Sequence, residues 1–465
     1  MNRDSTQTAL LWIVATGFFM QSLDTTIVNT ALPSIANGLH ESPLAMQPVV
    51  VAYTLTMALL TPASGWLADR FGTRRVYFAS ILLFVLGSIC CATAHTLPQL
   101  VIARVLQGVG GSMLLPIGRL AVLRSVSGDA YVSALAMISI AGQIGPILGP
   151  TLGGWFVEEA TWHWIFLINV PIGAVGMLAV LRYLPGSHSG TAPPFDWIGC
   201  GLLSACMVAI SLAIDAPMHT HREAWAAVLF VVGVAAALLY IPYARNRTVP
   251  LFRLGLFGEP NFSVGLIGNL VCRIGSSAVP FLVPLLLQLQ LGYTPLHSGM
   301  MMLPAAIAGT VTKRWIAPLI NRFGYEMFLL VNTVIVGASI VAFATFAAGT
   351  PLVFEIVVLS IFGGANSMQF AAMNSVTLKG LSKEDAGSGN SLFSMVQMLA
   401  IGLGVSIGGG LVNLFTPQGG SSAMGFRLAF ICVGLITLVS ALVFRRLDKA
   451  PAQPVRSTSA AAAGR

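Results

Sequence analysis

Long apolar stretches without a charged residue follow one another along almost the whole chain, separated by short polar segments. Residues 5–23, 42–68 and 76–103, for example, contain no Lys, Arg, Asp or Glu. A helix needs about 20 apolar residues to cross the hydrocarbon core of a bilayer. Strands of a membrane barrel would alternate polar and apolar residues over about ten positions, and these stretches do not. The pattern therefore predicts an all-α polytopic membrane protein.

Turn-forming residues divide the two longest apolar stretches and bring the predicted number of spans to fourteen. The uncharged stretch 274–312 is divided at 292–295 (Gly-Tyr-Thr-Pro), and the stretch 386–426 turns at 416–422. The predicted spans lie near 9–30, 47–68, 76–95, 98–122, 131–156, 163–184, 197–215, 224–244, 261–289, 298–319, 327–348, 352–377, 388–415 and 427–445.

An internal repeat relates the two ends of this series. The sequence Arg-Phe-Gly at 70–72, after the second span, recurs at 322–324, after the tenth, and the same offset of 252 residues relates the first span to the ninth. We therefore expect two six-helix bundles in parallel repeat, residues 9–184 and 261–446. Residues 185–260 would supply linkers and two extra transmembrane helices, and 447–465 a disordered cytoplasmic tail. Parallel repeats of this kind are typical of transporters, with the substrate site at the midplane between the halves.

Charge is scarce and one-sided. The chain has 24 Lys and Arg and 16 Asp and Glu, together 9% of its residues, against about 25% in soluble proteins. An even number of spans puts both termini on one side, and nineteen of the 24 basic residues fall there. Positive residues mark the cytoplasmic face, so both termini are expected to be cytoplasmic. The net charge of +8 then reflects topology, and nucleic acid is not an expected partner.

The loop after the second span combines glycines, an acid and several arginines: Gly65, Asp69, Arg70, Gly72 and Arg74. Asp69 would lie at a helix C-terminus, where the helix dipole disfavours an acid by about 0.3–1 kcal/mol. The positive N-terminus of the thirteenth span, near 386–389, could reverse that effect in one conformation only. The loop is therefore predicted to be a conformational latch. In the second half Asn321 replaces the acid, so a charged latch is expected in the first half alone.

A small-residue face marks the fifth span. Gly145, Gly149 and Gly153 recur at every fourth position, with Gly154 beside them, and Pro146 and Pro150 lie between them. Small residues at this spacing let a neighbouring backbone approach closely, and each proline removes one backbone hydrogen bond. Ordinary helix packing explains the pattern locally. The functional alternative is a hinge between two closely packed helices that also limits leak through the protein, and it depends on the same packing.

A few polar residues are predicted within the membrane. Asp24 lies near mid-membrane, where an acid either carries a proton or is a structural carboxyl bonded to Thr25 or Asn29. Arg104 shares a helix face with Gln107, and it either faces a partner or snorkels to the surface. The residues predicted to line a central substrate cavity are Gln21, Asn29, Gln107, Arg119 and Arg273. One carboxylate, Asp24, against three arginines in the spans suits an anionic substrate at least as well as a cationic one.

Several of these segments together resemble the major facilitator superfamily, and within it the drug:proton antiporters with fourteen spans. The loop 65–75 is similar to the superfamily's signature loop, 100–111 to its fourth-helix motif, 145–154 to its antiporter motif, and 23–33 and 164–173 to motifs of that subfamily. Ala141 and His163 depart from the usual Gly and Arg. The resemblance implies a monomeric multidrug exporter of the bacterial inner membrane, with Arg104 in the proton pathway.

Taken together, the sequence predicts a proton-coupled antiporter that exports drugs or other small toxic compounds by alternating access. Its partners would be the substrate, protons and the bilayer, with no cofactor and no metal. An exporter of an anionic metabolite or of a metal–carboxylate chelate is the alternative. An enzyme is not expected, because no span carries a nucleophile with a base and no phosphate-binding loop is present. A transporter-like membrane sensor would need a soluble output domain, which the sequence lacks.

Overall fold

The computed structural model describes residues 3–125, 129–184, 194–219, 223–248, 250–379, 381, 386–416 and 422–447. Helices make up nearly all of these residues, and the described part of the chain contains no strand. The side chains of three charged residues, Arg3, Asp129 and Asp215, lie outside the described residues. Of the tail predicted at 447–465, only Leu447 is described. The all-helical fold class predicted from the sequence is confirmed.

The first half of the chain forms a bundle of eight helical segments. They are α1 (Arg3–Gly38), α2 (Gln47–Leu60), α3 (Ser64–Phe71), α4 (Thr73–Ala92), α5 (Leu97–Ser125), α6 (Asp129–Glu159), α7 (Trp164–Leu167) and α8 (Asn169–Tyr183). Short 3-10 turns, η1 (Pro43–Met46) and η2 (Thr61–Ala63), lie before and after α2. We call the end of the bundle where α1 begins the terminal face, and the end where α6 ends the far face.

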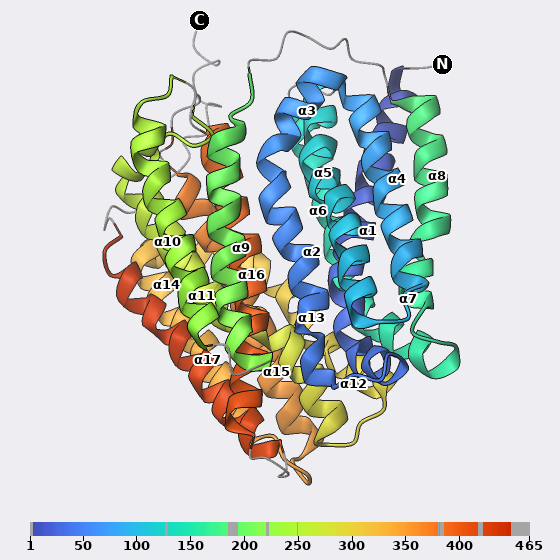
Figure 1. Cartoon of the computed structure of the whole chain (residues 1–465), viewed down its shortest axis with the longest axis vertical. Helices are drawn as coiled ribbons and strands as arrows, with labels where there is room; N and C mark the ends of the chain where they lie inside the picture. The colour runs from blue at the N-terminus through green and yellow to red at the C-terminus, as the bar shows by residue number, and fades with distance from the viewer. Residues whose placement is uncertain are drawn as a thin grey trace, which may run out of the picture.

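An inserted pair and a second bundle follow. The pair is α9 (Trp197–His219) and α10 (Glu223–Arg245). The second bundle consists of α11 (Pro260–Leu289), α12 (Pro295–Met301), α13 (Leu303–Val311), α14 (Ile316–Ala342), α15 (Leu352–Leu378), α16 (Ala386–Phe415) and α17 (Ala423–Phe444). The 3-10 turns η3 (Leu254–Gly258), η4 (Thr312–Trp315) and η5 (Phe343–Thr345) connect them. Figure 1 shows the first bundle in blue and cyan, the second in yellow to red, and the green pair beside α2 and α16.

Twelve helical stretches of the described residues are long and apolar enough to cross a membrane. One of them, Pro295–Thr345, has 51 residues, more than twice the length that one crossing needs. It contains α12, α13 and α14. The 31 residues of α6 are not among the twelve. The protein is thus a multi-pass membrane protein.

The same turn ends the second and the tenth predicted spans. Gly72 and Gly324 both have a positive φ, 86° and 77°, a conformation that residues with a side chain rarely adopt. Each glycine closes an Arg-Phe-Gly sequence and turns the chain at the terminal face. The repeated tripeptide therefore corresponds to a repeated backbone turn.

The two bundles share a hydrophobic core towards the far face. It joins buried residues of α1 at 27–36 and Val49 of α2 to residues of α11 at 278–287, and it extends to Met301 and Phe430. A separate cluster inside the first bundle includes Leu10, Tyr77 and Phe84. Apolar burial, the main favourable contribution to packing, is thus continuous between the halves at one end of the molecule.

Polar and aromatic contacts hold the inserted pair together and fix it to the first bundle at the terminal face. The Asp196 carboxylate accepts hydrogen bonds from the backbone N–H of Gly199, 3.0 Å away, and of Leu251, 2.9 Å away, and from the hydroxyl of Tyr243. Burial opposes ionisation of Asp196, but these hydrogen bonds and the nearby Arg247 hold its pKa below the usual range. Trp66 of α3, in the first bundle, packs against Phe195 and Trp197. The centroid of its ring lies 5.5 Å from that of Phe195 and 5.6 Å from that of Trp197.

Candidate functional site

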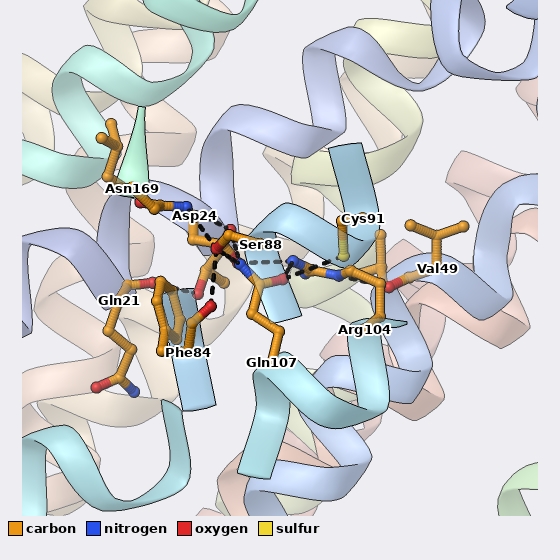
Figure 2. Close-up of polar contacts among 12 residues, drawn as sticks. Gln21, Asp24, Val49, Phe84, Ser88, Cys91, Arg104, Gln107 and Asn169 are labelled. Carbon is orange, nitrogen blue, oxygen red and sulfur yellow. Dashed lines mark hydrogen bonds and ion pairs between the residues drawn. The ribbon is translucent and has the colours of Figure 1, made fainter. Parts of the chain in front are cut away.

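A buried polar cluster lies in the interior of the first bundle, and Figure 2 shows its members. Asp24 of α1 and Arg104 of α5 form an ion pair, with Oδ2 and Nη1 2.7 Å apart and the two side chains 0% and 1% exposed. Arg104 also donates from Nε to the backbone oxygen of Val49, 3.1 Å away. Its guanidinium carbon lies 4.1 Å from the ring centroid of Tyr53. Two charges are therefore paired where no water reaches them.

Amide and hydroxyl groups complete the cluster. Gln107 donates from Nε2 to Oδ1 of Asp24 at 2.7 Å and to Oγ of Ser88 at 2.8 Å, and its Oε1 accepts from Arg104 at 2.6 Å. Asn169 donates to both Asp24 and Ser88 at 3.3 Å. Helices α1, α4, α5 and α8 each contribute a residue, which makes the cluster a junction of the first bundle. Such a network is stable only while each member keeps its partners.

The structure shows the partners of Asp24 and Arg104. Asp24 is bonded to Arg104, Gln107 and Asn169, whereas the Thr25 hydroxyl donates to the backbone oxygen of Gln21. Arg104 does not snorkel, since it is almost fully buried. Ser88 was not predicted from the sequence, and Asn169 was predicted only as part of the segment 164–173.

A second buried polar cluster lies in the other bundle and has no charge. Gln369 of α15 donates from Nε2 to Oγ1 of Thr333 at 2.7 Å, and its Oε1 accepts from Nδ2 of Asn332 at 2.7 Å. Asn332 also donates to the backbone oxygen of Ala365. The two bundles thus differ in the chemistry of their interiors.

A cavity of about 310 Å³ lies between the bundles. Its walls come from α1 and α6 of the first bundle and from α11, α13, η4 and α15 of the second. Apolar and small residues dominate, and the polar or charged lining residues are Thr26, Asn29, Thr30, Gln143, Arg273, Thr310, Lys313, Asn366 and Ser367. The volume is at the lower end of the range typical for small-molecule sites.

Two cations and no carboxylate line this cavity within the described part of the chain. Arg273 lies midway along α11, with its guanidinium carbon 4.5 Å from the ring centroid of Phe370. Its Nε is buried and donates to no described residue. Lys313 lies in η4, at the terminal end of α13, and the sequence analysis counted it only as a basic residue of the cytoplasmic side.

The predicted cavity residues divide into two groups. Asn29 and Arg273 line the cavity, and Gln21, Gln107 and Arg119 are not among its lining residues. Gln107 turns into the bundle to bond Asp24. Gln21 is buried, with Nε2 4.0 Å from Sδ of Met57, and Arg119 is exposed. The helix faces that carry Gln21 and Gln107 are occupied by packing within the first bundle.

The small-residue face of α6 brings it close to α1. A Cβ added at Gly145 would lie 2.2 Å from Oγ of Ser22, and one at Gly153 would lie 2.5 Å from the backbone oxygen of Ile27. Gly149 faces Thr26 in the same way. The prolines of this motif, Pro146 and Pro150, line the cavity.

At the far face α6 meets α12 of the second bundle with backbones almost in contact. A Cβ at Gly154 would lie 2.3 Å from the oxygen of Pro295, and one at Gly299 would lie 2.1 Å from the oxygen of Pro150. The N–H of Leu296 donates to Oε1 of Glu158 at 2.9 Å. The cavity is therefore closed on this side by direct packing of one half on the other.

The predicted latch loop makes its contacts within the first bundle. Asp69 pairs with Arg124, at the end of α5, with Oδ1 and Nη2 2.5 Å apart and the side chains 48% and 39% exposed. Arg124 also donates to Oγ1 of Thr73, and Arg74 donates to the backbone oxygen of Leu181. Asp69 therefore contacts α5 in this conformation, and the contact with the start of α16 that the sequence predicts for one conformation is not among its described interactions. Arg70 is exposed, and the space around Gly65 is open.

Comparisons with known proteins agree on one family. Residues 14–405 match the family model of the Major Facilitator Superfamily, and a second match covers residues 265–464. A Klebsiella pneumoniae subsp. pneumoniae protein named "Putative multidrug resistance protein MdtD" is 46% identical over 444 residues, which cover 94% of each chain. The protein of that name from Salmonella heidelberg is also 46% identical, over 443 residues and 94% of each chain.

Solved structures show the same fold at much lower identity. A POT family transporter in complex with 5-aminolevulinic acid has a TM-score of 0.69 at 16% identity, and the match covers 93% of this chain and 94% of that one. The nucleoside transporter NupG has a TM-score of 0.66 at 16% identity, over 96% and 98% of the two chains.

Proposed function

This chain belongs to the major facilitator superfamily, and we propose that it is a proton-coupled antiporter that exports small toxic compounds from a bacterial cell. It is an efflux transporter of the membrane, as its MdtD relatives at 46% identity indicate. The multidrug resistance in the names of those relatives supports drugs as one class of substrate. No cofactor is part of this proposal, because the proton gradient supplies the free energy.

The observation that carries the proposal is the buried pairing of Asp24 with Arg104 inside the first bundle, in a molecule with a cavity between its two bundles. A proton that binds to the Asp24 carboxylate removes its charge and therefore its ion pair. Arg104 is then a buried cation without a counter-charge, which is costly in a low dielectric. The cluster must then rearrange. Because it joins α1, α4, α5 and α8, the rearrangement alters the packing of these four helices. Asp24 and Arg104 are thus the proposed coupling residues.

The cavity is the proposed substrate site, and the contacts at its closed end are the proposed gate. Of the residues that the sequence predicts for the cavity, Asn29 and Arg273 line it. Lys313 is a further lining residue. Gly154 and Pro150 would separate from α12 when the far face opens. The remaining glycines of α6 would keep the seam with α1 tight, and the loop Gly65–Arg74 would stabilise one conformation at the terminal face.

We propose fourteen spans with both termini in the cytoplasm. Pro295–Thr345 is long enough for two spans, and α6 has the length of one more. The positive φ at Gly72 and Gly324 supports a parallel repeat of six spans, residues 9–184 and 261–446, with α9 and α10 inserted between them. In that orientation the closed far face is periplasmic. A reporter fused at Arg465 or within 185–194 should be cytoplasmic, and a periplasmic signal at either position contradicts this topology.

Transport by the purified protein tests the function directly. Proteoliposomes with an imposed pH gradient should accumulate substrate against its own gradient, and a protonophore should abolish the accumulation. The full-length protein is expected to do this as a monomer. Saturable binding without proton-dependent flux would instead identify a membrane sensor.

A further inference from the structure

We propose that the cavity between the bundles selects organic anions, which Arg273 and Lys313 bind together. This inference rests on the proposed function, because it names the substrate class of the same site. It starts from a charge imbalance. The lining residues include these two cations, and none of the lining residues that the structure describes is Asp or Glu.

Neither cation forms an ion pair with a residue that the structure describes. The ion pairs of the described residues are Asp24 with Arg104 and Asp69 with Arg124. The acid of the first pair is thus already committed to another arginine, inside the first bundle and away from the cavity. Arg273 contacts the face of Phe370 and has a buried Nε without an acceptor. A cation held in this way inside a membrane protein is costly unless an anion joins it.

The positions of the two residues suit a substrate that arrives from the terminal face. Lys313 lies at the terminal end of α13, whereas Arg273 lies midway along α11. A flexible ammonium group attracts an anion as a point charge, and a guanidinium group holds a carboxylate in a fixed forked geometry. Lys313 would therefore capture the anion, and Arg273 would fix its orientation.

The rest of the lining defines the body of the substrate. Phe362, Phe370, Met302 and the prolines of α11 offer apolar surface. Asn29 and Asn366 can donate hydrogen bonds as well as accept them. A carboxylate or sulfonate on a compact apolar or aromatic body fits this lining. An organic cation would meet two like charges and no counter-charge.

Binding to the purified full-length protein tests this selection without a proton gradient. Three probes share one aromatic body and differ in charge: 1-naphthoate, 1-naphthalenemethanol and 1-naphthylmethylammonium. Calorimetric titration should give naphthoate an affinity at least about tenfold above that of the ammonium probe. A naphthoate that does not bind at millimolar concentration, or that binds no more tightly than the ammonium probe, overturns the proposal.

Variants assign the selection to its residues. Arg273→Gln and Lys313→Gln should each weaken naphthoate binding by about tenfold and leave naphthalenemethanol binding unchanged, which also shows that the site is folded. Arg273→Lys should recover only part of the affinity. Arg314→Gln is the matched control, because this neighbour of Lys313 is exposed and lies over the ring of Trp315. Undiminished naphthoate binding in both cavity variants contradicts the assignment.

Transport separates this inference from the proposed function. A monoanion that leaves as one proton enters moves two charges in the same electrical direction, whereas a monocation exchanged for a proton moves none. An inside-negative potential of 100 mV should therefore favour anion export by about fifty-fold per charge. Proton-driven export of the ammonium probe alone would sustain the proposed function and remove the anion site. Naphthoate binding without proton-driven flux would sustain the anion site and contradict the proposed function.

Discussion

Asp24 and Arg104 are 80 positions apart in the chain, yet their side chains meet at 2.7 Å in the buried interior of the first bundle. Four helices hold this contact in place through Ser88, Gln107 and Asn169. The pair joins α1 to α5 at the centre of a network that spans four helices, and the first two predictions follow from it.

Asp24→Asn should abolish proton-driven accumulation of substrate, because an amide side chain does not take up a proton at physiological pH. Exchange of substrate down its own gradient should survive, since the cavity does not contain Asp24. Both are measured in proteoliposomes, with and without a pH gradient. Full proton-driven accumulation in this variant would move the coupling role to another acid, of which the buried Glu355 is the next candidate.

Arg104→Gln should lower the stability of the protein by about 3–5 kcal/mol, because it leaves Asp24 buried without its counter-charge. The double variant Asp24→Asn with Arg104→Gln removes both charges and should recover much of that loss. Thermal unfolding in detergent measures both effects. Additive losses in the double variant would show that the two residues are not coupled in stability.

Gly299→Val should shift the protein towards a conformation with an open far face, because its Cβ would lie 2.1 Å from the Pro150 oxygen. Overpacking of this kind costs about 1–3 kcal/mol, a factor of about 5–150 in the ratio of conformations. A cysteine at Thr30, in a variant without the six native cysteines, should react faster with an impermeant maleimide added at the far face. Gly255→Val is the control, since the space around Gly255 is open, and equal labelling in both variants contradicts the gate.

Asp69→Asn should slow transport several-fold with little change in expression or thermal stability. The ion pair with Arg124 is half exposed, and such pairs contribute about 0.2–1 kcal/mol. Asn321→Ala, at the matching position of the second half, should change transport much less. Equal loss of transport in the two variants would rule out an asymmetric latch.

Asp196→Ala should destabilise the inserted pair by about 2 kcal/mol at neutral pH, the usual contribution of hydrogen bonds to a charged group. Because the folded protein lowers the pKa of Asp196, its stabilisation is complete above the pKa of the unfolded chain, about 3.9. It is lost as the pH falls through the lower value of the folded state. The difference in melting temperature from the wild type should therefore persist down to about pH 5 and shrink below it. Glu259→Ala, an exposed acid that makes no capping bond, should show no such difference.

The sequence was sufficient for the fold class and for the placing of most helices, because apolar length alone determines which segments can cross a bilayer. The fourth predicted span, 98–122, corresponds to α5, Leu97–Ser125. Finer breaks were missed. The tenth predicted span, 298–319, is divided into α12, α13 and η4, since hydropathy does not detect a local change of helix type.

The candidate site was harder to predict, because it depends on which helices are neighbours. Asp24 and Arg104 were each identified as unusual, but nothing local indicates that α1 and α5 place them together. Lys313 was assigned to the cytoplasmic surface by its position near a span end. The turn η4 directs it towards the cavity and leaves Arg314 exposed.

The uncharged polar cluster of the second bundle has a consequence for how such a protein can diversify. The groups proposed to bind the proton all belong to the first bundle, and both cavity cations belong to the second. Substitutions in α11 and η4 could therefore alter the spectrum of exported compounds and leave the energy-coupling machinery intact. Chimeras of related exporters joined at the inserted pair should inherit pH dependence from one parent and substrate preference from the other.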